Sequence, residues 1–303
     1  MSYATGQITS SSTPATALKD EIETLLTAHA AWTKDDSFTA SIYTFEVWKS
    51  AGASNSFGTD FYVVMEHTSD ADRLFFRAME EFDNTTDQGR RGCPDNDSFS
   101  VTELDGTRYG DTYAALTDAN QFNPNVYVDM NVTDFNYFIG VSANAITVST
   151  TDSSSPIQAG LFEPLGSDPN EFPLVLMKFG HASQSNASTV SRRYDVIGAG
   201  NVTYGFTTKH SSSTTVDYSC WTRTDGQVGG TVNDSALGGP MGARALVSHY
   251  SIASSAGFTK RGLCYDVLMF DTAGAVDLGD TITVNADTYV YLGQSTWLDT
   301  TVT

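Results

Sequence analysis

The chain has 303 residues, 40% of them hydrophobic, and a formal net charge of −20 from 16 Lys and Arg against 36 Asp and Glu. This length and apolar content suffice for the core of one large domain or two medium ones. The charge repels phosphate backbones and anionic headgroups, so we expect no nucleic acid partner and no membrane insertion.

The acidic residues are unevenly divided between the two types. Nine are Glu, which leaves 27 Asp, while Lys occurs at only six positions. An Asp-rich, Lys-poor surface tolerates its own repulsion where concentrated salt shortens the screening length to about 3 Å. The pattern therefore favours a halophilic setting, and the alternative is an acidic surface that keeps the protein soluble in ordinary buffer.

The amino-terminal part is expected to be an arm followed by a helix. Residues 1–12 are small and polar, and we expect an extended arm that only a neighbouring molecule would order. Thr13-Pro14 is a typical helix start, and the helix is predicted to run to Lys34-Asp35-Asp36. His29 shares its apolar face and is expected to be a packed core residue. The apolar residues at helical spacing are Leu18, Ile22, Leu25, Leu26 and Trp32.

Between positions 38 and 83 the apolar pattern changes to a period of two. Strands are predicted at Phe38–Trp48, Phe57–Glu66 and Arg73–Phe82, although the third could also be a helix. A polar loop is expected at 84–98. Residues 107–125 are irregular, with a possible short helix at 113–119.

The region from Asp134 to Phe179 predicts a meander. Its apolar runs are rich in Tyr, Phe, Ile and Val, and turn compositions such as Asp-Ser-Ser-Ser-Pro separate them. The predicted strands are Phe135–Val141, Ala145–Thr150, Ile157–Leu165 and Phe172–Phe179.

The carboxyl-terminal part is richer in Gly, Ser and Thr. The segment 225–243 contains too much glycine for a strand or helix and is a candidate contact loop. Residues 289–297 are expected to be packed. Strands are predicted at 192–197, 202–208, 215–223, 244–252, 257–271 and 281–292.

The expected fold is mainly β with a minor α part, built from antiparallel β-sandwich or meander domains with one amphipathic N-terminal helix. We predict three segments. They are an extended arm at 1–12, a helix plus antiparallel β domain at 13–180, and a second β-rich domain at 181–303.

No set of residues in the sequence indicates a catalytic centre, so we expect no enzymatic activity and no cofactor. Gly198-Ala-Gly200 lacks the third glycine and the helix of a dinucleotide turn. No G-x-S-x-G is present, and the histidines (29, 67, 181, 210 and 249) form no partner pattern. The cysteines (93, 220 and 264) have no C-x-x-C spacing and are expected to be buried small side chains.

Two kinds of binding residue remain candidates. Carboxylate pairs could hold calcium, but none matches an EF-hand loop, and a chain with 36 acidic residues produces such pairs on a solvated face without any metal, so a metal site is left open. Trp221, Tyr250 and Trp297 could be surface platforms for a sugar, although core packing accounts for most aromatic residues. The carboxylate pairs are Asp95 with Asp97, Glu103 with Asp105, and Asp277 with Asp280.

Two stretches resemble structural proteins of tailed virus particles. The first is YFIGVSANAITVST followed, after a polar turn, by IQAGLFEPLGSDPNEFPLVL, and the second is the hairpin FEVWKSAGASNSFGTDFYVVME. Together they cover about a third of the chain, and the sequence from roughly 185 onward has no counterpart in the resemblance. The likeness lies in strand and turn spacing rather than in reactive groups.

The resemblance implies a virion protein of the tail tip or baseplate type, and the Asp-rich charge suggests a halophilic archaeal host. Its partners would be copies of itself, other virion structural proteins and a host surface glycoprotein. One alternative is a capsid decoration or turret protein. Others are a glycan- or receptor-binding module and a hydrolase of envelope polymers.

Overall fold

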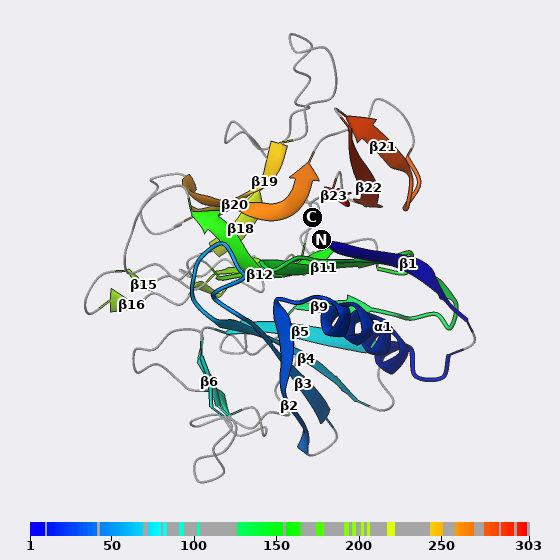
Figure 1. The fold of residues 1–303 in the computed structure, drawn as a ribbon, viewed down its shortest axis with the longest axis horizontal. Helices are drawn as coiled ribbons and strands as arrows, with labels where there is room; N and C mark the ends of the chain where they lie inside the picture. Colours follow the sequence, from blue (N-terminus) through cyan, green and yellow to red (C-terminus); the bar gives the residue numbers. More distant parts are fainter. Residues whose placement is uncertain are drawn as a thin grey trace.

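The computed structural model shows a mainly antiparallel β protein, as the sequence predicts (Figure 1). Among the described residues, no helix has the length and hydropathy needed to cross a membrane. The structure describes residues 1–9, 11–40, 43–68, 72–79, 81–83, 91–93, 102–103, 126–153, 156–164, 174–178, 191–193, 196–197, 201–202, 205–206, 217–221, 243–250, 258–269, 276–284, 286–293 and 296–301.

The smaller of the two main sheets has five strands in the order β2-β3-β4-β5-β9. Side chains alternate between its faces, as they must in extended strands. One face carries Trp48, Phe61 and Phe76 into the main core, and the other carries Phe45 and Val64 into a separate cluster. The strands are β2 (Trp32–Ala40), β3 (Tyr43–Ser50), β4 (Phe61–Thr68), β5 (Arg73–Met79) and β9 (Val126–Asp129).

The larger sheet has 13 strands. Eight of them follow one another along one path, in the order β1-β10-β11-β12-β20-β23-β22-β21. Off this path, β13 pairs with β12 and β14, β17 with β14, and β19 with β18 and β20. The path strands are β1 (Ser2–Ile8), β10 (Phe135–Val141), β11 (Ala145–Thr150), β12 (Ile157–Pro164), β20 (Phe258–Met269), β21 (Thr281–Val284), β22 (Asp287–Gly293) and β23 (Thr296–Asp299). The branch strands are β13 (Leu174–Lys178), β14 (Ser191–Arg193), β17 (Gly205–Phe206), β18 (Asp217–Trp221) and β19 (Ala243–Tyr250).

Two small sheets complete the described strands. The first contains β6 (Glu81–Asp83), β7 (Arg91–Cys93) and β8 (Thr102–Glu103), so the predicted polar loop at 84–98 includes a short strand. The second pairs β15 (Val196–Ile197) with β16 (Asn201–Val202).

Strand β12 connects two parts of the larger sheet. Its first half pairs with β11 and β13, whereas Phe162–Pro164 pair with β20. Gly160 has a φ of 153°, and a Cβ there would collide with the carbonyl oxygen of Asn144. Glycine is therefore required at position 160, where β12 approaches the turn between β10 and β11 so closely.

The structure stacks three layers (Figure 1). The five-stranded sheet packs on β10–β12, and β22 and β23 cover the opposite face of β10 and β11. In this outer layer Phe138 packs with Val290, Leu292 and Leu298. The Ser149 hydroxyl also donates a buried 2.8 Å hydrogen bond to the Leu292 carbonyl. Strands β10 and β11 are thus covered on both faces.

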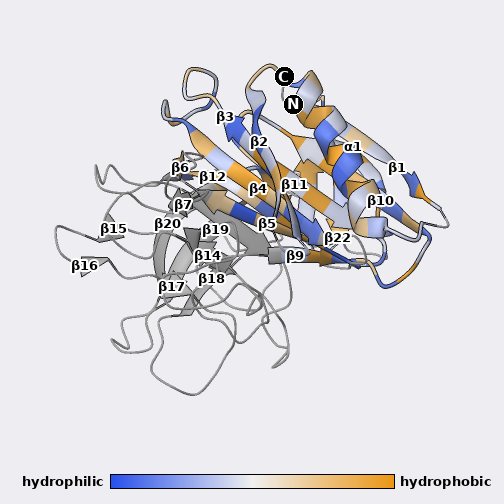
Figure 2. Ribbon diagram, turned by 90° about the horizontal axis from the view of Figure 1, so that it is seen from below, coloured by the Kyte–Doolittle hydropathy of each residue, from blue (hydrophilic) through white to orange (hydrophobic). Residues whose placement is uncertain are grey.

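Helix α1 (Pro14–Ala28) lies between the two main sheets beside β1 (Figure 1). Orange and blue residues alternate along it in Figure 2, as expected for an amphipathic helix. Leu18, Ile22 and Leu26 are fully buried. Burial of each such side chain stabilises the fold by about 1.5–3 kcal/mol.

The predicted extension of this helix to Asp36 is wrong. The helix ends at Ala28, with His29 in an extended conformation (φ −94°, ψ 117°), and Trp32 begins β2. Pairing along β3 favours the strand. Trp32 also donates a buried 2.7 Å hydrogen bond to the Ser142 carbonyl. These tertiary contacts override a helical spacing that continues to Trp32.

Residues 1–12 are not an arm that awaits a neighbouring molecule. Ser2–Ile8 form β1 and pair with β10 in seven consecutive positions, from Ser2 opposite Val141 to Ile8 opposite Phe135. A polar strand is stable here because β10 supplies the ladder and Ile8 enters the main core. The boundary at 180/181 stays a prediction, although described strands on both sides share one sheet.

The central meander is confirmed closely. Strands β10 and β11 have the predicted bounds, and β12 ends one residue earlier than expected. The run from Arg73 is a strand, β5, and not a helix. Two predicted strands are instead hairpins, because Phe38–Trp48 is divided between β2 and β3, and 281–292 between β21 and β22. Residues 107–125 and most of 225–243 lie outside the described residues.

Candidate functional site

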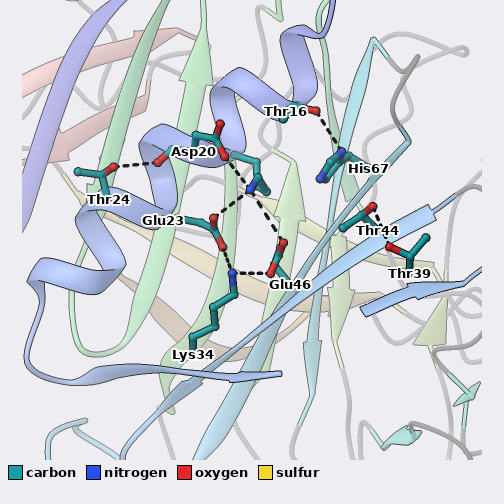
Figure 3. A network of polar contacts seen from close by, with 10 residues as sticks. Thr16, Asp20, Glu23, Thr24, Lys34, Thr39, Thr44, Glu46 and His67 are labelled. Atoms are coloured by element: carbon teal, nitrogen blue, oxygen red, sulfur yellow. Dashed lines mark hydrogen bonds and ion pairs between the residues drawn. The ribbon is translucent and has the colours of Figure 1, made fainter. Parts of the chain in front are cut away.

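The densest group of charged side chains in the described part joins α1 to the five-stranded sheet (Figure 3). Lys19 and Glu23 come from the helix, Lys34 from β2 and Glu46 from β3. Around this ionic ring the N–O distances are 2.9 Å (Lys19–Glu23), 2.8 Å (Glu23–Lys34), 2.6 Å (Lys34–Glu46) and 3.9 Å (Glu46–Lys19). Opposite charges therefore alternate around a closed loop.

Local geometry explains the ring. Lys19 and Glu23 are four residues apart and so project from the same side of the helix. Glu46 lies on the face of β3 that also carries Trp48 into the core, as the two-residue period requires. A register shift between Lys34 and Asp36 makes Asp35 the extra residue of a β-bulge, a feature that can re-aim a neighbouring side chain.

The charges of the ring stabilise one another. Burial would lower the pKa of Lys19, but hydrogen bonds to Asp20 and Glu23 outweigh it and raise the pKa above its ordinary value. The pKa of Lys34 is raised in the same way, against burial, by Glu23 and Glu46. Burial would raise the pKa of Glu23, but hydrogen bonds from Lys34 and Lys19 lower it.

Two further contacts surround the ring. Lys34 Nζ lies 5.8 Å from the centroid of the Trp48 ring, within the range of a cation–π interaction. On the previous turns of the helix, the Thr16 hydroxyl lies 3.3 Å from Nδ1 of the buried His67 of β4 (Figure 3). The first contact links β2 to β3, and the second holds α1 against β4.

The arrangement is that of a structural clamp. A lysine nucleophile or general base needs a lowered pKa, whereas both lysines here are held more firmly in the protonated form. The carboxylates of Glu23 and Glu46 are engaged by these two cations. The residues that the structure brings together therefore fix the helix in place.

A second ion pair lies on the other face of the five-stranded sheet. Arg77 donates to Glu66 Oε2 through Nη2 at 2.7 Å and Nε at 3.1 Å, and both side chains are fully buried. The cross-strand register places them diagonally, because Glu66 is opposite Phe75 and Val64 is opposite Arg77. This pair also links β4 to β5.

Of the three candidate sugar platforms, the structure describes the side chain of Trp297 alone. Trp297 is fully buried and packs against Tyr291 with ring centroids 5.0 Å apart, so it is packed, as expected for residues 289–297, and the alternative of a surface platform is wrong. In the β22–β23 hairpin the cross-strand partners Tyr291 and Trp297 lie on the face opposite to Val290 and Leu298, which pack on Phe138. Trp221 and Tyr250 lie in β18 and β19, and their side chains are outside the described residues.

The acidic pairs do not form a metal site where the structure shows them. Asp277 and Asp280 are exposed and close a turn, with Asp280 N–H donating to the Asp277 carbonyl at 3.0 Å. In the described ranges no group of three or more His, Cys, Asp or Glu could hold a metal ion. The side chains of the other two pairs (Asp95 with Asp97, and Glu103 with Asp105) are outside those ranges.

The remaining predicted residues have structural positions. His29 is not the packed core residue predicted on the helix face, because α1 ends at Ala28 and His29 follows it half-buried, where Nδ1 accepts a 3.3 Å hydrogen bond from Ala31 N–H. Cys264 is buried, as expected. The side chains of Cys93, Cys220 and the other carboxyl-terminal histidines (181, 210 and 249) are outside the described residues.

Sequence reasoning did not find the ionic ring. The spacing of Lys19 and Glu23 was the available signal, but their partners come from strands that no local pattern brings to the helix.

A scan against protein-family models finds no match for this chain, and a search of curated proteins finds no relative.

Proposed function

We propose that this chain is a structural component of a tailed virus particle, an assembly protein of the tail tip or baseplate that contributes to host attachment. Its partners are copies of itself, other virion structural proteins and a host surface glycoprotein. The host is a halophilic archaeon, and the protein resides in the virion.

One observation carries the proposal. The two stretches that resemble tailed-virus structural proteins, which include β3–β4 and β10–β13, form facing sheets around one core. Val63 and Met65 from the hairpin share this core with Ile146 and Val148 from the meander. The likeness thus covers a coherent folding unit, although its two parts are far apart in the sequence.

The charges of the described surface support the halophilic setting. The structure describes the side chains of five Lys and Arg residues, and each lies in an ion pair with a carboxylate: Lys19, Lys34, Lys49, Arg73 and Arg77. Exposed Asp35, Asp72 and Asp277 belong to none of these pairs. Dissolved cations must compensate this surplus of carboxylates, and concentrated salt supplies such cations.

Purified virus particles test the proposal. Particles of the virus that encodes this chain are kept at their native salt concentration, and the chain is quantified by mass spectrometry against the major capsid protein. We expect few copies per particle, and density for the three-layered fold at the tail in images of intact particles. Many copies on the shell would assign it to capsid decoration or turrets, and absence from particles would refute the proposal.

A further inference from the structure

The two main sheets end in edge strands of different character. Strand β2, at the edge of the five-stranded sheet, has a β-bulge at Lys34–Asp36 and carries the charged side chains of Lys34, Asp35 and Asp36. Bulges and charges are the usual protection of an edge against pairing with another chain. Strand β1 has neither feature, since its seven pairs with β10 are uninterrupted and SYATGQI contains no charged residue and no proline.

The outer side of β1 presents its backbone groups at regular intervals. Thr151 N–H donates to the Asn136 carbonyl, and Ser142 N–H donates to the Ala145 carbonyl, so the even-numbered residues of β10 point toward β11. The odd-numbered residues of β10 therefore bond to β1, where the register places Ser2, Ala4, Gly6 and Ile8 opposite them. This leaves the N–H and C=O groups of Tyr3, Thr5 and Gln7 on the outer side.

No strand in the described part pairs with that outer side, because β1 ends the strand order of the larger sheet. Thr5 and Gln7 are exposed. The backbone groups of Tyr3, Thr5 and Gln7 thus form an open ladder edge, which can accept a further antiparallel strand.

The absence of charged side chains on β1 indicates which molecule would pair with its open edge. Lys19 is the first charged side chain of the sequence, so β1 is an uncharged strip in a chain of net charge −20. Two copies can pair along this strip without placing charged side chains of β1 opposite one another, whereas the β2 edge carries Asp35 and Asp36. The strip also matches itself, because its three outward residues are evenly spaced about Thr5.

We infer that two copies of the chain pair through β1, antiparallel and about a twofold axis at Thr5. Thr5 then faces Thr5 of the second copy, and Tyr3 faces Gln7 of the second copy. Each of the three pairs forms two backbone hydrogen bonds, about six in all. This inference rests on the proposed function, for which it supplies one contact between copies in the particle.

A cysteine placed at the twofold position tests the register. In a hydrogen-bonded antiparallel pair the two Cα atoms at position 5 are about 5.5 Å apart, within disulfide range. In the same register the two Cα atoms at position 7 are more than about 13 Å apart. With the full chain in molar salt and a mild oxidant, Thr5→Cys is expected to give a covalent dimer, whereas the matched control Gln7→Cys is not.

The native cysteines are present in both variants and give a common background. The first tryptic peptide, residues 1–19, contains none of them, so the diagnostic product is this peptide joined to itself. Equal amounts of that product from Thr5→Cys and Gln7→Cys, or none from either, would overturn the inference.

A second variant tests the free edge without adding a thiol. Thr5→Pro removes an outward N–H while sparing the bonds of Ala4 and Gly6 to β10, a position that an edge strand tolerates. We expect Thr5→Pro to lose the dimer in sedimentation and Thr5→Val to keep it, with the thermal midpoints showing that both are folded. A dimer that survives Thr5→Pro contradicts β1 pairing but not residence in the particle, which the copy-number measurement decides separately.

Discussion

The ring of Tyr137 on β10 lies against Gly6 on β1. The two residues are direct cross-strand partners, and a Cβ at position 6 would come within 2.5 Å of the tyrosine hydroxyl oxygen. That hydroxyl donates a 2.9 Å hydrogen bond to Glu21 of α1. Gly6 thus makes room for a contact between β10 and the helix.

This relationship predicts a strong coupling between positions 6 and 137. Gly6→Ala should displace the Tyr137 ring and lower the free energy of unfolding by about 1–3 kcal/mol, the usual cost of overpacking. In a Tyr137→Leu background the same substitution should cost much less. Denaturant unfolding of the four proteins of this double-mutant cycle measures the coupling, and additive effects would contradict the contact.

The Tyr137 hydroxyl also predicts a dependence of stability on alkaline pH. Burial, followed by the hydrogen bond to Glu21 and its charge, raises the pKa of Tyr137 to about 12. Since the folded state holds this proton more tightly than the unfolded state, the contribution is complete below about pH 10 and is lost as the pH rises toward 12. Tyr137→Phe should therefore show a smaller loss of stability over this range, as measured by unfolding at a series of pH values.

The ionic ring predicts a loss on neutralisation of Glu23. Glu23→Gln should lower the free energy of unfolding by about 1.5–3 kcal/mol, because it weakens hydrogen bonds to two charged groups, Lys19 and Lys34. Asp35→Asn removes the same charge from an exposed site and serves as the control. If Asp35→Asn were equally costly, net charge rather than the ring would be responsible.

The pKa directions in the ring set its pH window. The pKa of Glu23 is lowered on folding, so its contribution is present above the unfolded value near 4.5 and disappears as the pH falls below it. The pKa values of Lys19 and Lys34 are raised, and their contributions are lost only as the pH rises above about 10.5. Unfolding of Glu23→Gln should therefore approach that of the wild type in acid.

The buried Glu66–Arg77 pair predicts opposite results for single and double replacement. Arg77→Met leaves a buried carboxylate without its cation and should cost about 3–5 kcal/mol, whereas adding Glu66→Leu should recover most of this loss. Urea unfolding of the three variants compares the free energies. A double variant as unstable as Arg77→Met would show that the pair itself, not the orphaned charge, matters.

Removal of salt should destabilise the folded chain. The net charge of −20 repels itself in the compact state, and screening weakens as the Debye length grows from about 3 Å at 1 M salt to about 10 Å at 0.1 M. Thermal midpoints measured from molar salt to dilute buffer should fall. Midpoints that stay constant would favour the ordinary acidic surface over the halophilic one.

The sequence predicted elements well where local pattern and turn chemistry agree. Strands β10 and β11 are rich in aromatic and β-branched residues and are bounded by small polar turns, and their limits were predicted correctly. The helix end was not, because Trp32 continues the helical spacing while its indole is anchored on Ser142, more than a hundred residues away. Strand β1 was missed because its stability comes from β10 and not from its own polar residues.

The ionic ring could not be predicted for the same reason. Helical spacing relates Lys19 to Glu23, but Glu46 reaches them only through the packing of β3 beneath α1. Trp297 is a case where the expectation from sequence was confirmed, since residues 289–297 were expected to be packed and this side chain is fully buried. Strand β23 pairs with β20 and β22, and the Trp297 ring packs against Tyr291 of β22.

The passage of β12 from one part of the larger sheet to the next has a mechanical consequence. Because Ile157–Gly160 bond to β11 and β13 and Phe162–Pro164 bond to β20, no flexible tether separates the two groups of strands at this point. A force applied to β20 would therefore act on β12, whose residues Ile157, Ala159 and Leu161 pack in the main core. The joint at Gly160 is therefore expected to behave as a rigid corner and not as a hinge.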